Sequence, residues 1–436
     1  MAHPVKWFSE AMGGAPLLST DTGNGTAGTL ISVLKACLVT GFNINPIQSI
    51  TLNGGLAVAT FALAHGFLPD SIVAIEGVNL NWNGEYRVLS VTTTTVTFAP
   101  VGTPSAVGAG GTMKVAPAGW ELEFVDGTNT VAVFKRLAAD ATALRLRIDN
   151  SAFSGWNGTA TYRYYYAKAQ MVENVTDVNT YTLVKEFAWP ASHAYATGEQ
   201  QWDLVADDKL FYFLPRYSTT KMAAVLMFGD INSIRPNDNY HCVLTGILTP
   251  AQSTAYHWGA RLASTTGYPI FNDVLQFGSL VGAVGASSNI AFINRRSLFA
   301  IARMHHQLPG SDNCLLLGIG YTFGCPYQAG VGYPNATDSG VYFNDGKIPI
   351  VEQTAQSIRG FLPGVLSPLQ NDLRLWRYNI AHDPAKPGSL LRILKAAGAM
   401  DLSATAGSTE SGSGTSYTEY RNTERLIGFD IAGPWR

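Results

Sequence analysis

The clearest helical pattern in the chain lies between residues 26 and 41. Its apolar side chains recur every three or four positions and therefore share one helix face: Leu30, Val33, Leu34, Cys37 and Leu38. Thr29 is expected to cap the start of the helix, and Gly41 to end it. A helix this short is marginal alone, so it is expected to pack against the rest of the protein.

The pattern switches to a period of two from residue 48 onward. Five short strands are expected up to residue 115, and Asn53-Gly54-Gly55 predicts the turn between the first two. Several short strands with short loops are typical of a small β-barrel or sandwich. We therefore predict an inserted β-module at 48–115, preceded by a helix-containing part of the body at 1–47.

One ribbon of this module, residues 81–98, is unusually regular and rich in threonine. Asn83-Gly84 predicts a turn, and the run Thr92 to Thr95 follows a strand that alternates between two faces. Threonine is β-branched and favours half-buried strand surfaces, which explains the row without any function. The other interpretation is that the threonine row forms a docking edge for another subunit.

The rest of the chain, residues 116–436, predicts a β-rich main body, so the fold class is mainly β with a sandwich-like body. Strands are expected in seven places: 116–124, 128–137, 143–151, 161–175, 209–217, 221–231 and 240–248. The Ser/Thr/Gly-rich stretch 401–420 predicts a flexible loop. The final segment RLIGFDIAGPWR predicts a last strand that ends in an aromatic anchor.

Composition narrows the choice of partners. Only 14% of residues are charged, where about a quarter is ordinary, and 44 glycines accompany many Ser, Thr and Asn residues. Such surfaces suit contact with other proteins.

The net charge is −2 and Lys and Arg do not cluster, so no nucleic-acid partner is expected. No apolar run is long enough for a membrane span, and the start lacks the apolar core of a signal peptide.

Candidate metal ligands gather between residues 305 and 325. They include two adjacent histidines together with an aspartate and two cysteines: His305, His306, Asp312, Cys314 and Cys325. Adjacent strand residues point to opposite faces, and no metal-binding spacing is present, so no metal or cofactor is expected. The four cysteines, which also include Cys37 and Cys242, are expected to be reduced and buried.

Catalytic chemistry finds little support in the sequence. No nucleophile elbow is present, and the eight histidines stand alone. Glycan-cleaving enzymes use pairs of carboxylates, and the candidates here are Asp207-Asp208, Asp230 and Asp238. Aspartate also favours loop ends because it bonds its own backbone, and this structural interpretation is preferred. We therefore expect no catalytic, cofactor-binding or metal-binding residue and no enzymatic activity.

Five segments together resemble tail-associated structural proteins of tailed bacteriophages: HPVKWFSEAMGGAP, TLISVLKACLVTGFN, VATFALAHGFLPDSIVAIEGVNLNWNGEYRVLSV, MFGDINSIRPNDNYHCVL and FDIAGPWR. The third segment is similar to small β-domains that are common in phage tail and baseplate components. The resemblance spans most of the chain and carries over no catalytic residue. It implies a virion component that is made in the bacterial cytoplasm and assembled in several copies.

The leading hypothesis is thus a non-enzymatic virion protein of the tail or baseplate region, a homo-oligomer that docks to other virion proteins. A receptor- or glycan-binding fibre or a capsid-decoration protein is the alternative, with aromatic residues of 321–335 stacking on sugars. A depolymerase that uses Asp230 or Asp238 is a third hypothesis.

Overall fold

The structure is a computed structural model that describes the chain in thirteen ranges, namely 4–18, 26–151, 166–191, 201–215, 225–246, 299–303, 312–316, 343–344, 348–352, 357–368, 377–381, 390–396 and 425–436. The expected loops at 321–335 and 401–420 lie outside these ranges. Within them the fold is mainly β, as predicted, and every strand pairing is antiparallel. No helix in these ranges is long and apolar enough to cross a membrane.

A ten-stranded sheet runs through the body in the order β1-β14-β15-β16-β18-β19-β20-β22-β23-β17. Its strands are β1 (Lys6–Ser9), β14 (Trp202–Ala206), β15 (Leu210–Pro215), β16 (Leu226–Asp230), β17 (Asn232–Ser233), β18 (Cys242–Thr245), β19 (Phe299–Ile301), β20 (Asp312–Leu316), β22 (Ile348–Glu352) and β23 (Ser357–Leu362). The expected runs at 209–217, 221–231 and 240–248 therefore all contain strands of this one sheet.

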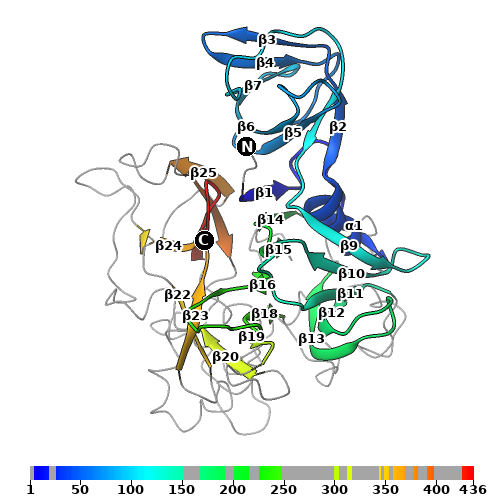
Figure 1. Ribbon diagram of the computed structural model, residues 1–436, viewed down its shortest axis with the longest axis vertical. Coiled ribbons are helices and arrows are strands. Elements are labelled where there is room, and N and C mark those ends of the chain that lie inside the picture. The colour runs from blue at the N-terminus through cyan, green and yellow to red at the C-terminus, as the bar shows by residue number, and fades with distance from the viewer. Residues whose placement is uncertain are drawn as a thin grey trace, which may run out of the picture.

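Two five-stranded sheets flank the ten-stranded sheet (Figure 1). The first, called the β9–β13 sheet, contains β9 (Trp120–Val125), β10 (Val131–Arg136), β11 (Arg145–Asp149), β12 (Tyr166–Glu173) and β13 (Thr182–Pro190). The second, called the β24–β27 sheet, contains β21 (Phe343–Asn344), β24 (Val365–Pro368), β25 (Arg377–Ala381), β26 (Leu390–Ala396) and β27 (Arg425–Asp430).

A seven-stranded sheet occupies residues 42–115 and stands at one end of the molecule, with β3 and β4 farthest from the body (Figure 1). Its order is β2-β8-β5-β6-β7-β4-β3. The strands are β2 (Phe42–Pro46), β3 (Ser49–Asn53), β4 (Leu56–Thr60), β5 (Ile72–Glu76), β6 (Gly84–Val91), β7 (Thr95–Phe98) and β8 (Thr112–Val115). We call this sheet and its connections the module.

The module thus has seven strands rather than the five predicted, and it forms a curled sheet rather than a closed barrel. One of the two additional strands, β2, lies before residue 48. Its Asn and Pro residues have low β-propensity, so the sequence pattern does not predict a strand there. The edge strands β2 and β3 follow each other along the chain, so the sheet curls back toward its own start. The domain boundaries at 47/48 and 115/116 stay predictions.

The threonine run of the module is not a strand face, because Thr92 to Thr94 form the turn between β6 and β7 and only Thr95 belongs to a strand. The hydroxyl of Thr92 accepts hydrogen bonds from the backbone N–H groups of Thr94 and Thr95 at 3.3 and 3.1 Å. The hydroxyls of Thr92 and Thr95 also lie 2.7 Å apart. The run therefore closes the β6–β7 hairpin, and the alternation predicted for residues 81–98 ends at a bulge between Val88 and Ser90.

The expected helix forms α1 (Thr29–Lys35), which continues as the π-helical turn η1 (Ala36–Thr40). Gly41 ends it with a φ of 70°, as predicted. The cap assigned to Thr29 is wrong, because Gly28 occupies the capping position and Thr29 is already helical. The buried side chain of Asn150 accepts a hydrogen bond from the N–H of Leu30 at 3.2 Å, so a distant strand end satisfies the first turn.

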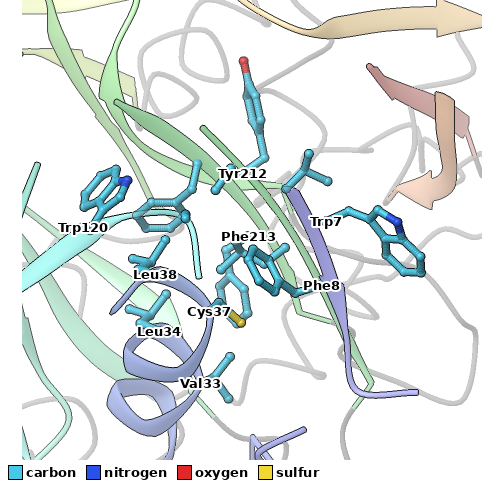
Figure 2. Close-up of a cluster of buried hydrophobic side chains, with 14 of the residues drawn as sticks. Trp7, Phe8, Val33, Leu34, Cys37, Leu38, Trp120, Tyr212 and Phe213 are labelled. Carbon is cyan, nitrogen blue, oxygen red and sulfur yellow. The ribbon is translucent and has the colours of Figure 1, made fainter. Parts of the chain in front are cut away.

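The predicted apolar face of the helix is fully buried. Figure 2 shows Val33, Leu34 and Leu38 pointing toward aromatic side chains of the body, which include Phe8 of β1 and Phe213 of β15. The helix end is also fixed by its backbone, because the carbonyls of η1 accept hydrogen bonds from Ala118 and Gly119 at 2.9 and 3.0 Å. The helix therefore belongs to the main core, as its short length required.

Candidate functional site

The side chains with catalytic potential in the sequence were four aspartates, and the structure places them in and beside the ten-stranded sheet. Asp208 is exposed, whereas Asp207 and Asp230 are buried and Asp238 sits in the connection between β17 and β18. Each buried candidate meets an arginine from another part of the chain. A further aspartate, Asp203 of β14, does the same.

Asp230, the last residue of β16, forms an ion pair with Arg136, the last residue of β10. The two side chains are 1% and 0% exposed, so the pair is excluded from water. Thr142 completes the site, since its N–H and its hydroxyl each donate to the carboxylate at 2.8 Å. The other guanidinium nitrogen donates to the carbonyls of Thr142 and Leu144 at 3.0 and 2.8 Å. The carboxylate oxygens are therefore occupied by donors from the protein itself.

The surroundings keep the guanidinium of Arg136 charged. Burial opposes the charge of Arg136, but the neighbouring Cys242 and Asp230 hold its pKa above the ordinary value. The guanidinium also lies over the ring of Phe228, 5.2 Å from the centroid. Burial raises the pKa of the Cys242 thiol to about 12, so this cysteine is no nucleophile.

Asp238 binds Arg359 of β23 through both carboxylate oxygens. One of these contacts, from Nη2 to Oδ1, measures 2.6 Å, and the arginine side chain is fully buried. The hydroxyl of Ser233 donates to the same carboxylate at 2.6 Å. Burial alone would raise the pKa of Asp238, but the hydrogen bonds from Arg359 and Ser233 hold it below its ordinary value. The carboxylate is thus ionised at neutral pH and engaged on both oxygens.

Asp207 joins the start of β15 to the last residue of the sequence. Its Oδ1 accepts from the N–H groups of Lys209 and Leu210 at 2.8 and 2.7 Å, and its Oδ2 lies 2.6 Å from Nη1 of Arg436. Burial raises the pKa of Asp207 despite the nearby arginine. Arg436 also donates to the side chain of Asn232 at 2.9 Å, so it connects the β14–β15 turn to the start of β17.

Asp203 pairs with Arg392 of β26 at 2.9 Å. The guanidinium lies 4.2 Å from the centroid of the Trp7 ring, so β1, β14 and β26 meet at one point. Trp435, the aromatic anchor that the sequence predicted, packs against Tyr212 of β15 with ring centroids 5.6 Å apart. It is 8% exposed, and its indole N–H donates to the carbonyl of Asp430 at 2.7 Å.

The four arginine pairs share one chemical consequence. A general acid or nucleophile in glycan cleavage must reach the substrate, and one member of the carboxylate pair must release a proton. Buried carboxylates that hold guanidinium groups instead act as cross-links between strands. All four arginines were missed in the sequence, although for three of them the surrounding apolar residues gave a signal: Arg136 in VAVFKR, Arg359 in SIRGFL and Arg392 in LLRIL.

The candidate metal ligands between residues 305 and 325 fall outside the side chains that the structure describes. His305, His306 and Cys325 lie outside the described residues, as do the side chains of Asp312 and Cys314. Among the residues that are described, no group of three or more His, Cys, Asp or Glu side chains is arranged to hold a metal ion. Cys37 and Cys242 are free and buried, as expected.

Comparison with known proteins adds little to this geometry. No protein family matches the sequence, and no curated protein matches it either. Among solved structures, the chain is similar to the phage phi92 endosialidase with 8% sequence identity and a TM-score of 0.14. The alignment covers 89% of this chain and 51% of that protein, so the chain spans about half of the endosialidase's length. A TM-score this low carries no argument about fold or function.

Proposed function

We propose that this protein is a non-enzymatic structural component of a tailed-phage particle. It would assemble in several copies in the tail or baseplate region and dock to neighbouring virion proteins. The observation that carries the proposal is the use of Asp203, Asp207, Asp230 and Asp238, each of which holds an arginine from a distant segment. The carboxylates of these four aspartates are thereby engaged in cross-links between separate segments of the chain.

The architecture suits a structural component that must keep its shape under mechanical force. The four ion pairs connect the ten-stranded sheet to β10, to β26 and to Arg436, and also join its own β23 to the β17–β18 connection. Removing one partner of a buried pair leaves an uncompensated charge, so the pairs Arg136–Asp230 and Arg392–Asp203 favour one arrangement of the sheets that they join. The sequence resemblance to tail-associated proteins agrees with this role but is independent of it.

The proposal is tested on particles and on glycans. Peptides of this chain should be recovered from purified particles of the source that encodes it, after a density gradient that removes free protein.

The purified protein should release no reducing ends from host cell-surface polysaccharide. Turnover that disappears in both Asp230→Asn and Asp238→Asn variants, with their fold intact, would overturn the proposal in favour of a depolymerase. Tight binding without turnover would favour a receptor-binding fibre.

A further inference from the structure

The connection between β4 and β5, residues 61–71, carries the one histidine of the module, His65. Its side chain is 3% exposed, and the rings of Phe61 and Phe67 lie against it with centroids 5.1 and 5.2 Å away. The module therefore holds a titratable group inside an aromatic cluster and away from water. Histidine is the side chain whose charge ordinarily changes between about pH 5 and 8, so this position can respond to mild acid.

The hydrogen bonds of His65 assign its proton. The backbone N–H of Phe67 donates to Nδ1 at 3.0 Å, so Nδ1 acts as an acceptor and carries no proton. Nε2 lies 3.1 Å from the carbonyl oxygen of Thr95, which is itself an acceptor, so Nε2 carries the proton. The network therefore selects the neutral imidazole protonated at Nε2, with both ring nitrogens engaged.

No negative charge is placed to stabilise a protonated ring at this position. The elements around His65 are the turn after β1, β2, the β4–β5 connection and the β6–β7 hairpin. Their charged side chains each bind a partner in the body: Glu10 binds Trp202, Asp70 binds Asn379, Glu85 binds Lys6 and Arg87 binds the carbonyl of Ile431. In the described part of the chain none of these carboxylates forms an ion pair with the imidazole. An imidazolium would therefore be buried without a counter-charge.

Uptake of a proton would break this arrangement. The added proton must go to Nδ1, where it would point at the N–H of Phe67 instead of at an acceptor. Two donors that face each other at 3.0 Å lose their hydrogen bond and repel. The rings of Phe61 and Phe67 attract a cation only weakly, which does not offset a buried charge together with an unpaired buried N–H. The charged side chain is therefore expected to leave its site for water.

The backbone at His65 forms a contact between the module and the body. The carbonyl of Gly66 accepts from the N–H of Gly13 at 2.8 Å, and the carbonyl of His65 accepts from the side chain of Asn43 at 2.7 Å. The two glycines meet so closely that a Cβ on Gly66 would stand 2.7 Å from the Cα of Gly13. Because Gly13 belongs to the turn after β1, this contact attaches the module to the first strand of the ten-stranded sheet.

We infer that His65 is an acid-sensitive latch. In its neutral form it holds the β4–β5 connection against the turn after β1, and in its protonated form it releases that contact. The contact is therefore complete at neutral pH and is lost as the pH falls. Two further bonds of the module to the body start from Glu85 and Arg87 of β6, so acid opens one side of the module while β6 stays attached. The inference goes beyond the proposed function and does not depend on it.

Amide hydrogen exchange of the purified full-length protein, followed by mass spectrometry, tests the latch. Exchange is compared at about pH 7.5 and about pH 5, with exchange times scaled for the intrinsic effect of pH on amides. Peptides that contain Gly13 and Phe67 should exchange at least about tenfold faster in acid, whereas peptides of β14 and β15 should not change. Unchanged exchange at Gly13 and Phe67, or an equal rise over the whole chain, would overturn the inference.

Two substitutions separate the titration of His65 from a general effect of acid. His65→Asn keeps an oxygen acceptor for the N–H of Phe67, two residues farther along the chain, but takes up no proton in this range of pH. It should keep the contact closed at both pH values. His241→Asn is the matched control in the body and should keep the full acid response at Gly13 and Phe67. Acid opening of His65→Asn equal to that of the wild type, or its loss in His241→Asn, would contradict the latch.

Nitrogen NMR of the wild-type protein, labelled in its histidines, gives a readout that needs no substitution to fold. At about pH 7.5 the spectrum of His65 should show a neutral ring with its proton on Nε2. On acidification the ring should become charged over the same range of pH in which exchange at Gly13 and Phe67 rises. A ring protonated at Nδ1 at about pH 7.5, or one that stays neutral while the contact opens, would overturn the inference.

Discussion

The guanidinium of Arg136 and the carboxylate of Asp230 are in direct contact, and both side chains are almost completely excluded from water. The pair joins the end of β10 in the β9–β13 sheet to the end of β16 in the ten-stranded sheet. Neither strand can move relative to the other without exposing a buried charge to water or separating it from its partner. The contact therefore fixes how two sheets pack, which is a structural role for one of the two aspartates that the depolymerase hypothesis named.

Removing one partner of this pair should be far more harmful than removing both. Asp230→Ala leaves the guanidinium buried without its counter-charge, and we expect a loss of about 3–5 kcal/mol in the free energy of unfolding. The double variant Arg136→Met/Asp230→Leu restores apolar packing and should lose much less than Asp230→Ala alone. Urea unfolding followed by tryptophan fluorescence measures both. A double variant as unstable as the sum of its single substitutions would contradict the account.

Acid should release the Asp238–Arg359 pair. Because the pKa of Asp238 is lower in the folded protein than the value of about 3.9 in an unfolded chain, the pair stabilises the fold above that value. This stabilisation is lost as the pH falls through the folded pKa. The difference in unfolding midpoint between wild type and Asp238→Asn should therefore be largest at neutral pH and shrink below about pH 4.

Asp207 contributes to the same titration with the opposite sign. Burial raises its folded pKa, so ionising it costs stability as the pH rises from the unfolded pKa through the folded one. The difference between wild type and Asp238→Asn cancels this contribution, because both proteins keep Asp207. A difference that stays constant from pH 7 to pH 3 would show that Asp238 is not held ionised by Arg359.

Two glycines of positive φ should respond very differently to alanine. Gly229 lies opposite Leu210 with a φ of 141°, and an added Cβ would stand 2.5 Å from the Cα of Leu210. Gly54, in the β3–β4 turn, has a φ of 58° and open space around it. Gly54→Ala should cost about 1–2 kcal/mol from backbone strain, and Gly229→Ala should add about 1–3 kcal/mol of overpacking. Thermal unfolding of the two variants compares them, and equal losses would contradict this account.

The body should fold without the module. Phe42 and Val115 are paired residues of β2 and β8, so a two-residue turn can connect them once residues 43–114 are removed. The shortened protein loses Glu85, which pairs with Lys6, and Arg87, which donates to the carbonyl of Ile431, yet it keeps the helix and the core of the body. Circular dichroism should show β-structure and cooperative unfolding. An insoluble or unfolded product would show that the module is an integral part of the body.

Much of the fold was predictable because its patterns are local. The helix face at Leu30 to Leu38 and the β3–β4 turn at Gly54-Gly55 follow from apolar spacing and turn chemistry. The strand β1 was missed because it lies in a segment that reads as polar, although Trp7 and Phe8 are buried. The helix cap was missed because Asn150, which satisfies it, lies far away in the sequence.

The candidate site was less predictable than the fold. The sequence interpretation treated Asp230 and Asp238 as turn residues that bond their own backbone. Asp238 does accept from the N–H of Tyr240 at 3.1 Å, but the ion pairs of both aspartates were not anticipated. Their partners Arg136 and Arg359 stand 94 and 121 positions away, and no local pattern connects residues so far apart. The packing of the sheets determines which charged side chains pair with each other, and a single sequence does not reveal that packing.

Quantitative mass spectrometry of purified particles tests the proposed role most directly. The source that encodes this chain would supply the particles, and a tail protein of known copy number would supply the internal standard. The account predicts that peptides of this chain are present at a small whole-number multiple of that standard. Peptides near the copy number of the capsid protein would instead indicate a head-decoration protein. Their absence from intact particles would contradict the structural role.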